Sequence, residues 1–344
     1  MDNCKMCQDN PADKTNTHYL TDGVIRTCLN EEGVNIREKG LMFNISLDKN
    51  SIEAKFQRNT SQKAIKQMFG RDASDSEIDD AKKVPFSVDH FFCSACEKRF
   101  TEIEEYFLKE ILPQLRGNDF DGKTEIVFDN LLVRKFFLLQ IYRTAVCDPE
   151  LKISTEMLEK LRLIILNAET DSEEVKSVPL NITYLNTVGD NYEYTKNTVG
   201  TASEGENRLI LFNDFIIHFH ESNDFPAFID FWGLNEKDTF ADFTNYQEEN
   251  FKIKILNNKE RLQFWNRYYK EKAHQQISFY RSKFTRSYIR MYGVPPHPSY
   301  LQKFVTAIIY GNDIKDEPRY SSAQFEKMLK LYLPIFKPIR SRRR

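Results

Sequence analysis

The chain has 344 residues, of which 40% are hydrophobic, and it contains 12 Gly and 12 Pro. This composition provides apolar cores for two or three domains, and it excludes both a small disulfide-stapled protein and a largely disordered one. The formal net charge is only -2, so the overall charge by itself indicates no class of partner.

The first predicted domain is residues 1–117, which begins with two cysteines, Cys4 and Cys7, and ends with a helix that follows Cys93 and Cys96. That helix is predicted from apolar residues at helical spacing, namely Phe100, Ile103, Phe107 and Ile111. Pro113 and Gly117 end the pattern. The polar stretch 58–83 predicts a surface excursion with one short helix over 62–68.

The second predicted domain, residues 118–250, begins with helices over 130–146 and 155–166, the latter capped by Ser154. Short β-rich runs separated by Asn, Gly and Asp then predict hairpins. These runs are 179–185, 208–212, 214–220 and, just beyond this range, 251–256. The expected fold class is therefore α+β, with a small antiparallel sheet and a long C-terminal helix.

The third predicted domain, residues 251–344, is basic, aromatic and helical. It holds 21 Lys and Arg against 6 Asp and Glu, whereas residues 1–250 hold 28 against 45. A long helix is expected over 260–292 and a last one over 322–333. At 100° per residue, five basic residues fall within about 60° of one another beside an apolar stripe. They are Arg261, Lys272, Lys283, Arg286 and Arg290.

This basic row predicts contacts with nucleic-acid phosphates, because Lys and Arg on one helix face can follow a polyanion. The alternative is a solvated face that pairs with the acidic residues of 1–250. Neither membrane spanning nor secretion is expected, because the apolar run 131–146 is interrupted by charged and amide side chains and residues 1–10 lack an apolar stretch. The cytoplasm is the expected location.

The two C-x-x-C pairs predict one structural Zn²⁺ ion, because a two-residue spacer turns both thiolates toward one point and four sulfurs complete a tetrahedral shell. Six cysteines in a chain of this length read better as metal ligands than as a disulfide framework. The alternatives are four unrelated cysteines, or a site in which Cys28 or His90 replaces one thiolate. A closed four-sulfur shell leaves no position for substrate.

The order of motifs in residues 1–170 resembles the zinc-containing HNH, or ββα-metal, endonucleases. Residues 17–21 (Thr-His-Tyr-Leu-Thr) resemble a Ser-His-Ile-Ile-Pro-like segment of uncharacterised prokaryotic proteins, and residues 93–104 resemble their Cys-x-x-Cys-Glu helix start. The helical residues 139–146 also resemble that group. The resemblance implies an N-terminal treble-clef or ββα-metal zinc module and hydrolysis of DNA phosphodiester bonds.

Carried over to this sequence, the resemblance makes His18 the general base and Glu97 a ligand of a catalytic Mg²⁺ or Mn²⁺ ion. The sequence departs from the family at two positions. Thr17 stands where many members have an Asp that is a second cation ligand, and Thr21 stands where the motif has proline. Asp22 or Glu104 could supply the missing carboxylate. The alternative roles are a structural strand histidine for His18 and a helix N-terminal charge for Glu97.

Other candidate residues have simpler explanations. His218 and His220 alternate with apolar residues and are expected on an exposed strand face, although two histidines there could bind a metal. Cys147 is expected to be a small buried apolar residue. No Gly-rich phosphate loop or G-x-S-x-G motif is present, so nucleotide hydrolysis and serine-hydrolase chemistry have no support.

The expected function is a metal-dependent, HNH-like endonuclease acting on DNA. HNH-like modules commonly occur together with proteins of antiviral defence, and this association suggests a role in antiviral defence or another response to foreign DNA. The alternative is a catalytically silent zinc-knuckle protein that binds nucleic acid or a partner protein.

Overall fold

The structure of the chain is a computed structural model. It describes residues 2–25, 41–46, 51–56, 60–82, 86–116, 120, 122–167, 172–186, 198–204, 207–221, 244–310 and 322–338. The chain forms two compact units, each built from two separate stretches. Unit 1 comprises Met1–Arg37 and Val84–Trp265, and unit 2 comprises Glu38–Lys83 and Asn266–Arg344. These units differ from the three consecutive ranges expected from the sequence, because 38–83 groups with the C-terminal helices.

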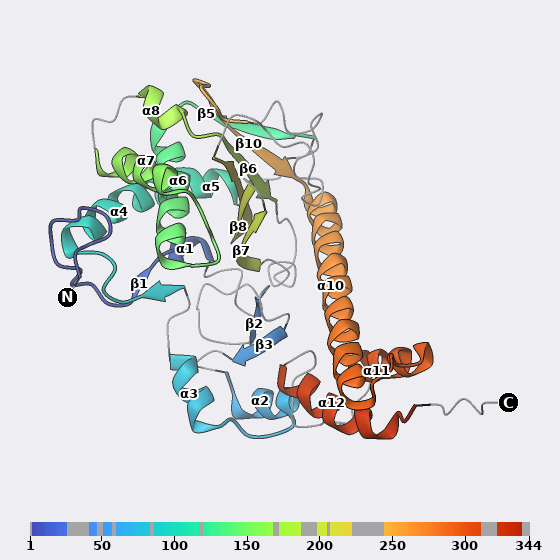
Figure 1. The fold of residues 1–344 in the computed structure, drawn as a ribbon. Helices are drawn as coiled ribbons and strands as arrows, with labels where there is room; N and C mark the ends of the chain where they lie inside the picture. The colour runs from blue at the N-terminus through green and yellow to red at the C-terminus, as the bar shows by residue number, and fades with distance from the viewer. Residues whose placement is uncertain are drawn as a thin grey trace. The chain divides into compact units, whose positions relative to one another are not determined.

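A six-stranded mixed sheet runs through unit 1 in the order β5-β10-β6-β9-β8-β7 (Figure 1). Its strands are β5 (Glu125–Phe128), β6 (Leu180–Leu185), β7 (Thr198–Glu204), β8 (Asn207–Asn213), β9 (Phe215–His220) and β10 (Phe251–Leu256). Neighbouring strands are antiparallel except β10 and β6, which are parallel. The α+β class is confirmed, but the sheet is larger than expected and is mixed rather than antiparallel, because β10 and β6 are parallel. The sequence analysis predicts neither β5 nor β7, and the Gly, Thr and Ser residues of β7 form no apolar run.

The helices of unit 1 include α6, which contains the most apolar run of the sequence. They are α1 (Asp22–Ile25), α4 (Ser94–Tyr106), a π-helical turn (Phe107–Ile111), α5 (Leu112–Leu115), α6 (Leu131–Cys147), α7 (Thr155–Leu166) and α8 (Ser172–Lys176). Residues 136–144 of α6 are buried without interruption. A helix that is buried on every side must lie inside the fold, and α6 contacts α4, α7, α8 and β10.

Aromatic side chains join the helices of unit 1 to its sheet. The ring of Phe107 stacks on that of Phe136 with centroids 3.7 Å apart. Phe137 contacts Phe215 on β9 and Phe251 on β10, at 5.7 and 5.8 Å between ring centroids. Burial of such side chains stabilises unit 1.

The helix after Cys96 continues past Tyr106 through a π-helical turn, Phe107–Ile111, which ends two residues before Pro113. Pro113 has no backbone N–H and its ring crowds the preceding turn, so the helix widens at this point. Both Phe107 and Ile111 remain buried. The proline therefore changes the helical geometry within the predicted segment, and the helix ends at Leu115.

The predicted cap of α7 is confirmed, since Ser154 Oγ accepts a hydrogen bond from the backbone N–H of Met157 at 3.1 Å. We expect Ser154→Ala to lower the free energy of unfolding of the protein by about 1 kcal/mol in urea denaturation, because one N–H of the first turn loses its acceptor. Ser154→Gly, a better N-cap than Ala, should cost only a few tenths of a kcal/mol. Equal stabilities for the parent and Ser154→Ala would show that the cap contributes nothing.

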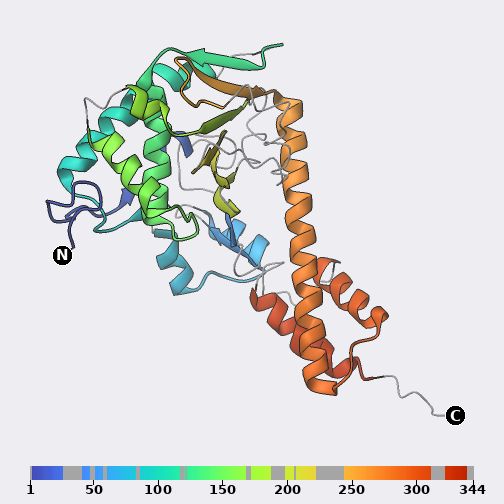
Figure 2. The same cartoon turned by 45° about the horizontal axis from the view of Figure 1, so that its top comes forward.

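Unit 2 contains a hairpin, β2 (Leu41–Ser46) and β3 (Ser51–Phe56), and the helices α2 (Gln62–Phe69) and α3 (Asp75–Lys82). It also contains most of α10 (Asn258–Tyr292), together with α11 (Pro298–Tyr310) and α12 (Ser322–Ile335). The long helix α10 is continuous (Figure 2). The sequence predicts α2, α10 and α12. It does not predict α3, whose residues are mostly polar, or α11.

An aromatic core holds the C-terminal helices of unit 2 together. Phe284 of α10 stacks on Phe304 of α11 with centroids 4.4 Å apart, and Tyr280 stacks on Phe325 of α12 at 5.0 Å. The middle of the predicted apolar stripe of α10 is therefore a packing face, as expected. Among the described residues, no helix combines the length and apolar character that crossing a membrane requires.

Candidate metal centre and adjacent cleft

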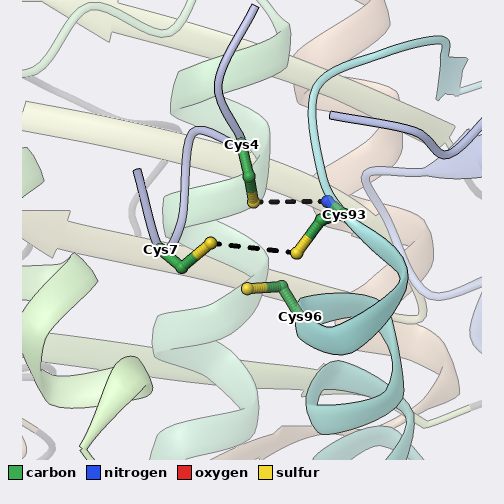
Figure 3. Close-up of side chains that lie close together, drawn as sticks. All are labelled: Cys4, Cys7, Cys93 and Cys96. Atoms are coloured by element: carbon green, nitrogen blue, oxygen red, sulfur yellow. Dashed lines mark hydrogen bonds between the residues drawn. The ribbon is translucent and has the colours of Figure 1, made fainter. Parts of the chain in front are cut away.

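Cys4, Cys7, Cys93 and Cys96 converge in unit 1, with their four Sγ atoms all within 4.8 Å of one another (Figure 3). Cys7 Sγ and Cys93 Sγ are 3.8 Å apart. Tetrahedral Zn²⁺ with Zn–S bonds of about 2.3 Å requires sulfur atoms about 3.8 Å apart, so the spacing fits that ion. These four cysteines could hold a metal ion such as zinc.

Local backbone geometry builds the cysteine cluster. The N–H of Gln8 donates to the carbonyl of Cys4 at 2.9 Å, and Gln8 has a left-handed φ of 64°, so the chain turns tightly around the first pair. The N–H of Cys93 donates to Cys4 Sγ at 3.2 Å. Cys93 precedes α4 and Cys96 lies in its first turn, which directs both thiols toward the first pair (Figure 3).

The surroundings of the sulfurs shift the pKa values of the thiols in different directions. Burial raises the pKa of the Cys4 and Cys96 thiols, so these two groups need a bound cation to persist as thiolates. At Cys7, burial acts in the same direction, but backbone hydrogen bonds from Asn10 and Asp9 outweigh it and lower the pKa to about 7. The Asn10 side chain also donates to Cys7 Sγ at 3.7 Å.

Of the two alternative ligands, His90 does not join this cluster. His90 Nδ1 lies 3.1 Å from the carbonyl oxygen of Ala12, and His90 is not in the sulfur group. Cys28 lies outside the described residues. Cys147 is half-buried at the end of α6, where burial raises the pKa of its thiol to about 12.

A polar cleft of about 570 Å³ lies beside the first turn of α4, within unit 1. Strand β1 (Thr17–His18), which pairs with β4 (Ser87–Val88), forms one wall together with α1, while α4 and α6 supply the remaining charged groups. The principal charged and titratable groups that line it are Lys14, His18, Asp22, Glu97, Lys98, Glu104 and Arg143. The cleft therefore gathers an imidazole, three carboxylates and three cationic groups.

His18 and Asp22 form one pair in the cleft. His18 Nε2 lies 3.7 Å from Asp22 Oδ1, and the two side chains are 29% and 28% exposed. Both predicted catalytic residues, His18 and Glu97, line this cleft, as do Asp22 and Glu104, which the sequence offers as additional carboxylates.

Glu97 and Glu104 lie seven residues, or about two helical turns, apart on α4 and share one arginine. Arg143 Nη1 donates to Glu104 Oε1 at 2.8 Å, and Nη2 lies 3.9 Å from Glu97 Oε1. Burial raises the pKa of Glu97. The capping carboxylate at the start of α4 is that of Asp13, which accepts from the N–H and hydroxyl of Ser94 at 2.8 and 2.9 Å.

Sequence reasoning does not select Arg143, Gln140 or Thr21 as site residues. Arg143 is 2% exposed and packs its guanidinium over Phe100, with 5.1 Å between Cζ and the ring centroid. One feature of the sequence could have identified Arg143 and Gln140: both lie inside the most apolar run of the chain, and buried polar side chains require partners.

Two expectations about exposure are wrong. His218 and His220 are buried at 2% and 1% exposure, with ring centroids 4.4 Å apart, so they do not lie on an exposed strand face. Burial lowers the pKa of His218 well below its usual value, so this imidazole is neutral. Arg261 is also fully buried, where Nη2 donates to Asn258 Oδ1 at 2.8 Å, so it cannot extend an exposed basic row.

The remaining members of the basic row lie in the part of α10 that belongs to unit 2. Lys283, Arg286 and Arg290 are exposed, whereas Lys272 is half-buried, with its Nζ 5.6 Å from the ring centroid of Tyr268. The row available to a partner is therefore the C-terminal half of the helix.

Searches of protein-family models, curated proteins and solved structures find no match to this chain.

Proposed function

We propose that unit 1 is a zinc-stabilised, HNH-like endonuclease that hydrolyses DNA, with a treble-clef or ββα-metal arrangement around the four cysteines. The observation that carries the proposal is the cleft beside the cysteine cluster, which gathers His18 from β1 with Glu97 from the first turn of α4. The order of these features along the chain also supports the proposal. It is a cysteine pair, a strand with His18, a second cysteine pair and a helix with Glu97.

In this proposal, His18 removes a proton from the attacking water through its imidazole ring, and Asp22, 3.7 Å away, favours the imidazolium that results. Glu97, together with Asp22 or Glu104, would hold a Mg²⁺ or Mn²⁺ ion. Such an ion, when bound, supplies positive charge to the scissile phosphate and the leaving oxygen. Lys14 and Lys98 line the same cleft and offer cationic contacts to neighbouring phosphates.

A nicking assay tests the proposal. Purified zinc-loaded protein should convert supercoiled plasmid to open circles in Mg²⁺ or Mn²⁺, and not when these ions are omitted. Parallel reactions with structured RNA separate a DNA enzyme from an RNA enzyme. Absence of cleavage of either substrate, at enzyme concentrations above substrate and with zinc present, would contradict the proposal.

A second candidate is a non-catalytic zinc-knuckle module that binds nucleic acid or a partner protein. The observation in its favour is the pairing of Glu104 with Arg143, which already neutralises one carboxylate in the cleft. This candidate predicts binding without nicking, and gel-shift measurements on the same preparation would reveal it.

The exposed basic row of α10 is the proposed contact with nucleic acid in unit 2. Replacing Lys283, Arg286 and Arg290 by Gln should weaken binding to all sequences alike. It should also flatten the slope of log affinity against log salt by about 0.7 to 0.9 for each contact removed, because fewer counterions are released. Fluorescence anisotropy over a range of salt concentrations measures both effects.

The same helix offers a matched control for this prediction. Arg267, Lys270 and Arg281 are exposed on unit 2 and lie about 140 to 200° around the helix from Lys283. Their replacement by Gln removes the same charge from the opposite side of α10. Equal effects of the two triple variants would indicate nonspecific attraction, and no effect of the first would indicate that the row only balances acidic charge within the protein.

A further inference from the structure

Helix α6 supplies two buried polar side chains that contact residues lining the cleft. Gln140 and Arg143 are three residues apart on this helix and therefore share one face. Their side chains are 0% and 2% exposed, so any polar group on them must find its partner inside the fold. The partners of the Gln140 amide and of the two Arg143 Nη atoms all belong to the cleft walls or to α6 itself.

Thr21 is the point at which these contacts converge. Its backbone N–H donates to Gln140 Oε1 at 3.0 Å, and its hydroxyl donates to Glu104 Oε1 at 2.7 Å. Arg143 donates to that same Glu104 oxygen at 2.8 Å. The backbone N–H and the hydroxyl of Thr21, a residue that is 3% exposed, are thus tied, directly or through Glu104, to α6.

The location of Thr21 gives these bonds a consequence for the chemistry. Thr21 immediately precedes Asp22 and lies three residues after His18, so its backbone connects the two members of the His18–Asp22 pair. Glu104 stands across the cleft on α4. The Arg143 guanidinium is also fixed over the ring of Phe100 and lies 3.9 Å from Glu97, so it cannot reorient without disturbing α4.

We infer that Gln140 and Arg143 are positioning residues, which through Thr21 and Glu104 set the place of His18 and Asp22 opposite the carboxylates of α4. This role rests on the proposed nuclease function, since it concerns the geometry of the same cleft. Neither residue needs to touch substrate. Displacement of a catalytic group by about 1 Å can cost about 100-fold in rate, so small shifts of Thr21 should be measurable.

The test compares Arg143→Lys and Thr21→Val with Arg134→Lys. The lysine keeps the charge of Arg143 but loses the planar fork, and valine removes only the hydroxyl of Thr21. Arg134 is a matched control, because it is a buried arginine of the same helix that donates to the backbone carbonyls of Asn245 and Glu248, outside the cleft.

We expect kcat for nicking to fall about 10- to 100-fold in Arg143→Lys and Thr21→Val, with KM changed less than about twofold. The control should keep the parental kcat even if its melting temperature falls. Parental kcat in both cleft variants, or an equal loss in the control, would overturn the inference. Because valine is similar in size to threonine, Thr21→Val keeps the test decisive if Arg143→Lys fails to fold.

An NMR measurement separates this inference from the nuclease proposal. The chain has six histidines, and comparison with His18→Ala identifies the ring signals of His18. These signals should shift in zinc-loaded Arg143→Lys and Thr21→Val but not in Arg134→Lys. If the parent cleaves nothing, the nuclease proposal fails while the shifts still support the positioning role; unshifted His18 signals would refute that role even in an active enzyme.

Discussion

His18→Ala is expected to reduce metal-dependent DNA cleavage by about 100- to 10,000-fold, because general base catalysis contributes about that factor to an enzymatic rate. The β1–β4 pairing should survive, since it uses the backbone of Thr17 and His18 with Ser87 and Val88. Single-turnover nicking, with enzyme in excess over plasmid, measures the chemical step. Zinc content and melting temperature should stay at their parental values.

A control for this variant is His90→Asn. His90 lies near the cysteine cluster but outside the cleft, and its φ of 62° is one that asparagine tolerates. The control should cleave within about twofold of the parent, a margin well inside the 100-fold expected for His18. If His18→Ala nicked DNA as fast as the parent, His18 would be a structural residue and the non-catalytic module would become the better explanation.

Removal of the metal is expected to have the largest effect on stability. Purified protein should carry about one zinc per chain, and apparent binding free energies of structural Zn²⁺ sites reach about 10–16 kcal/mol. Cys4 and Cys96 are part of the apolar core of unit 1, together with Phe100 and Phe136. Cys96→Ser should therefore lose zinc and lower the melting temperature of unit 1, rather than loosen only the first turns of the chain.

Elemental analysis and thermal denaturation check this expectation. Cys147→Ser is the matched control, because Cys147 is a half-buried thiol of unit 1 outside the cluster, and its loss should leave one zinc per chain. Parent protein purified without chelators that contained no zinc, or a Cys96→Ser variant that melted with the parent, would rule out a structural metal at these cysteines.

Local interactions explain which features could be predicted from the sequence. The C-x-x-C spacing brings two thiols together within one turn of chain, and the cap of α7 depends on Ser154 and the residues directly after it. The strand β10 and the helix α10 follow from patterns that repeat every two residues or every three to four. Each of these signals lies within a few positions, so it is visible without the fold.

Positions far apart in the chain decide the rest. Arg143 lines the cleft and binds Glu104, although the two residues are 39 positions apart in the sequence. Residues 38–83 belong to the same unit as the C-terminal helices, which are far away in the sequence. The alternation of His218 and His220 with apolar residues is compatible with an exposed or a covered face, and only the packing of the sheet buries them. Likewise, helical angles place Arg261 in the basic row, but its tertiary surroundings remove it from solvent.

The sequence by itself therefore determined the two C-x-x-C pairs, the α+β class, the strands β6, β8, β9 and β10 and the helices α2, α4, α6, α7, α10 and α12, because hydrogen bonding and side-chain periodicity act over short separations. Only the tertiary structure decided which polar side chains share the cleft and which charged groups are buried. Those outcomes depend on which surfaces pack together, and a polar side chain takes its role from partners that can be more than a hundred residues away, as Gln140 does with Thr21.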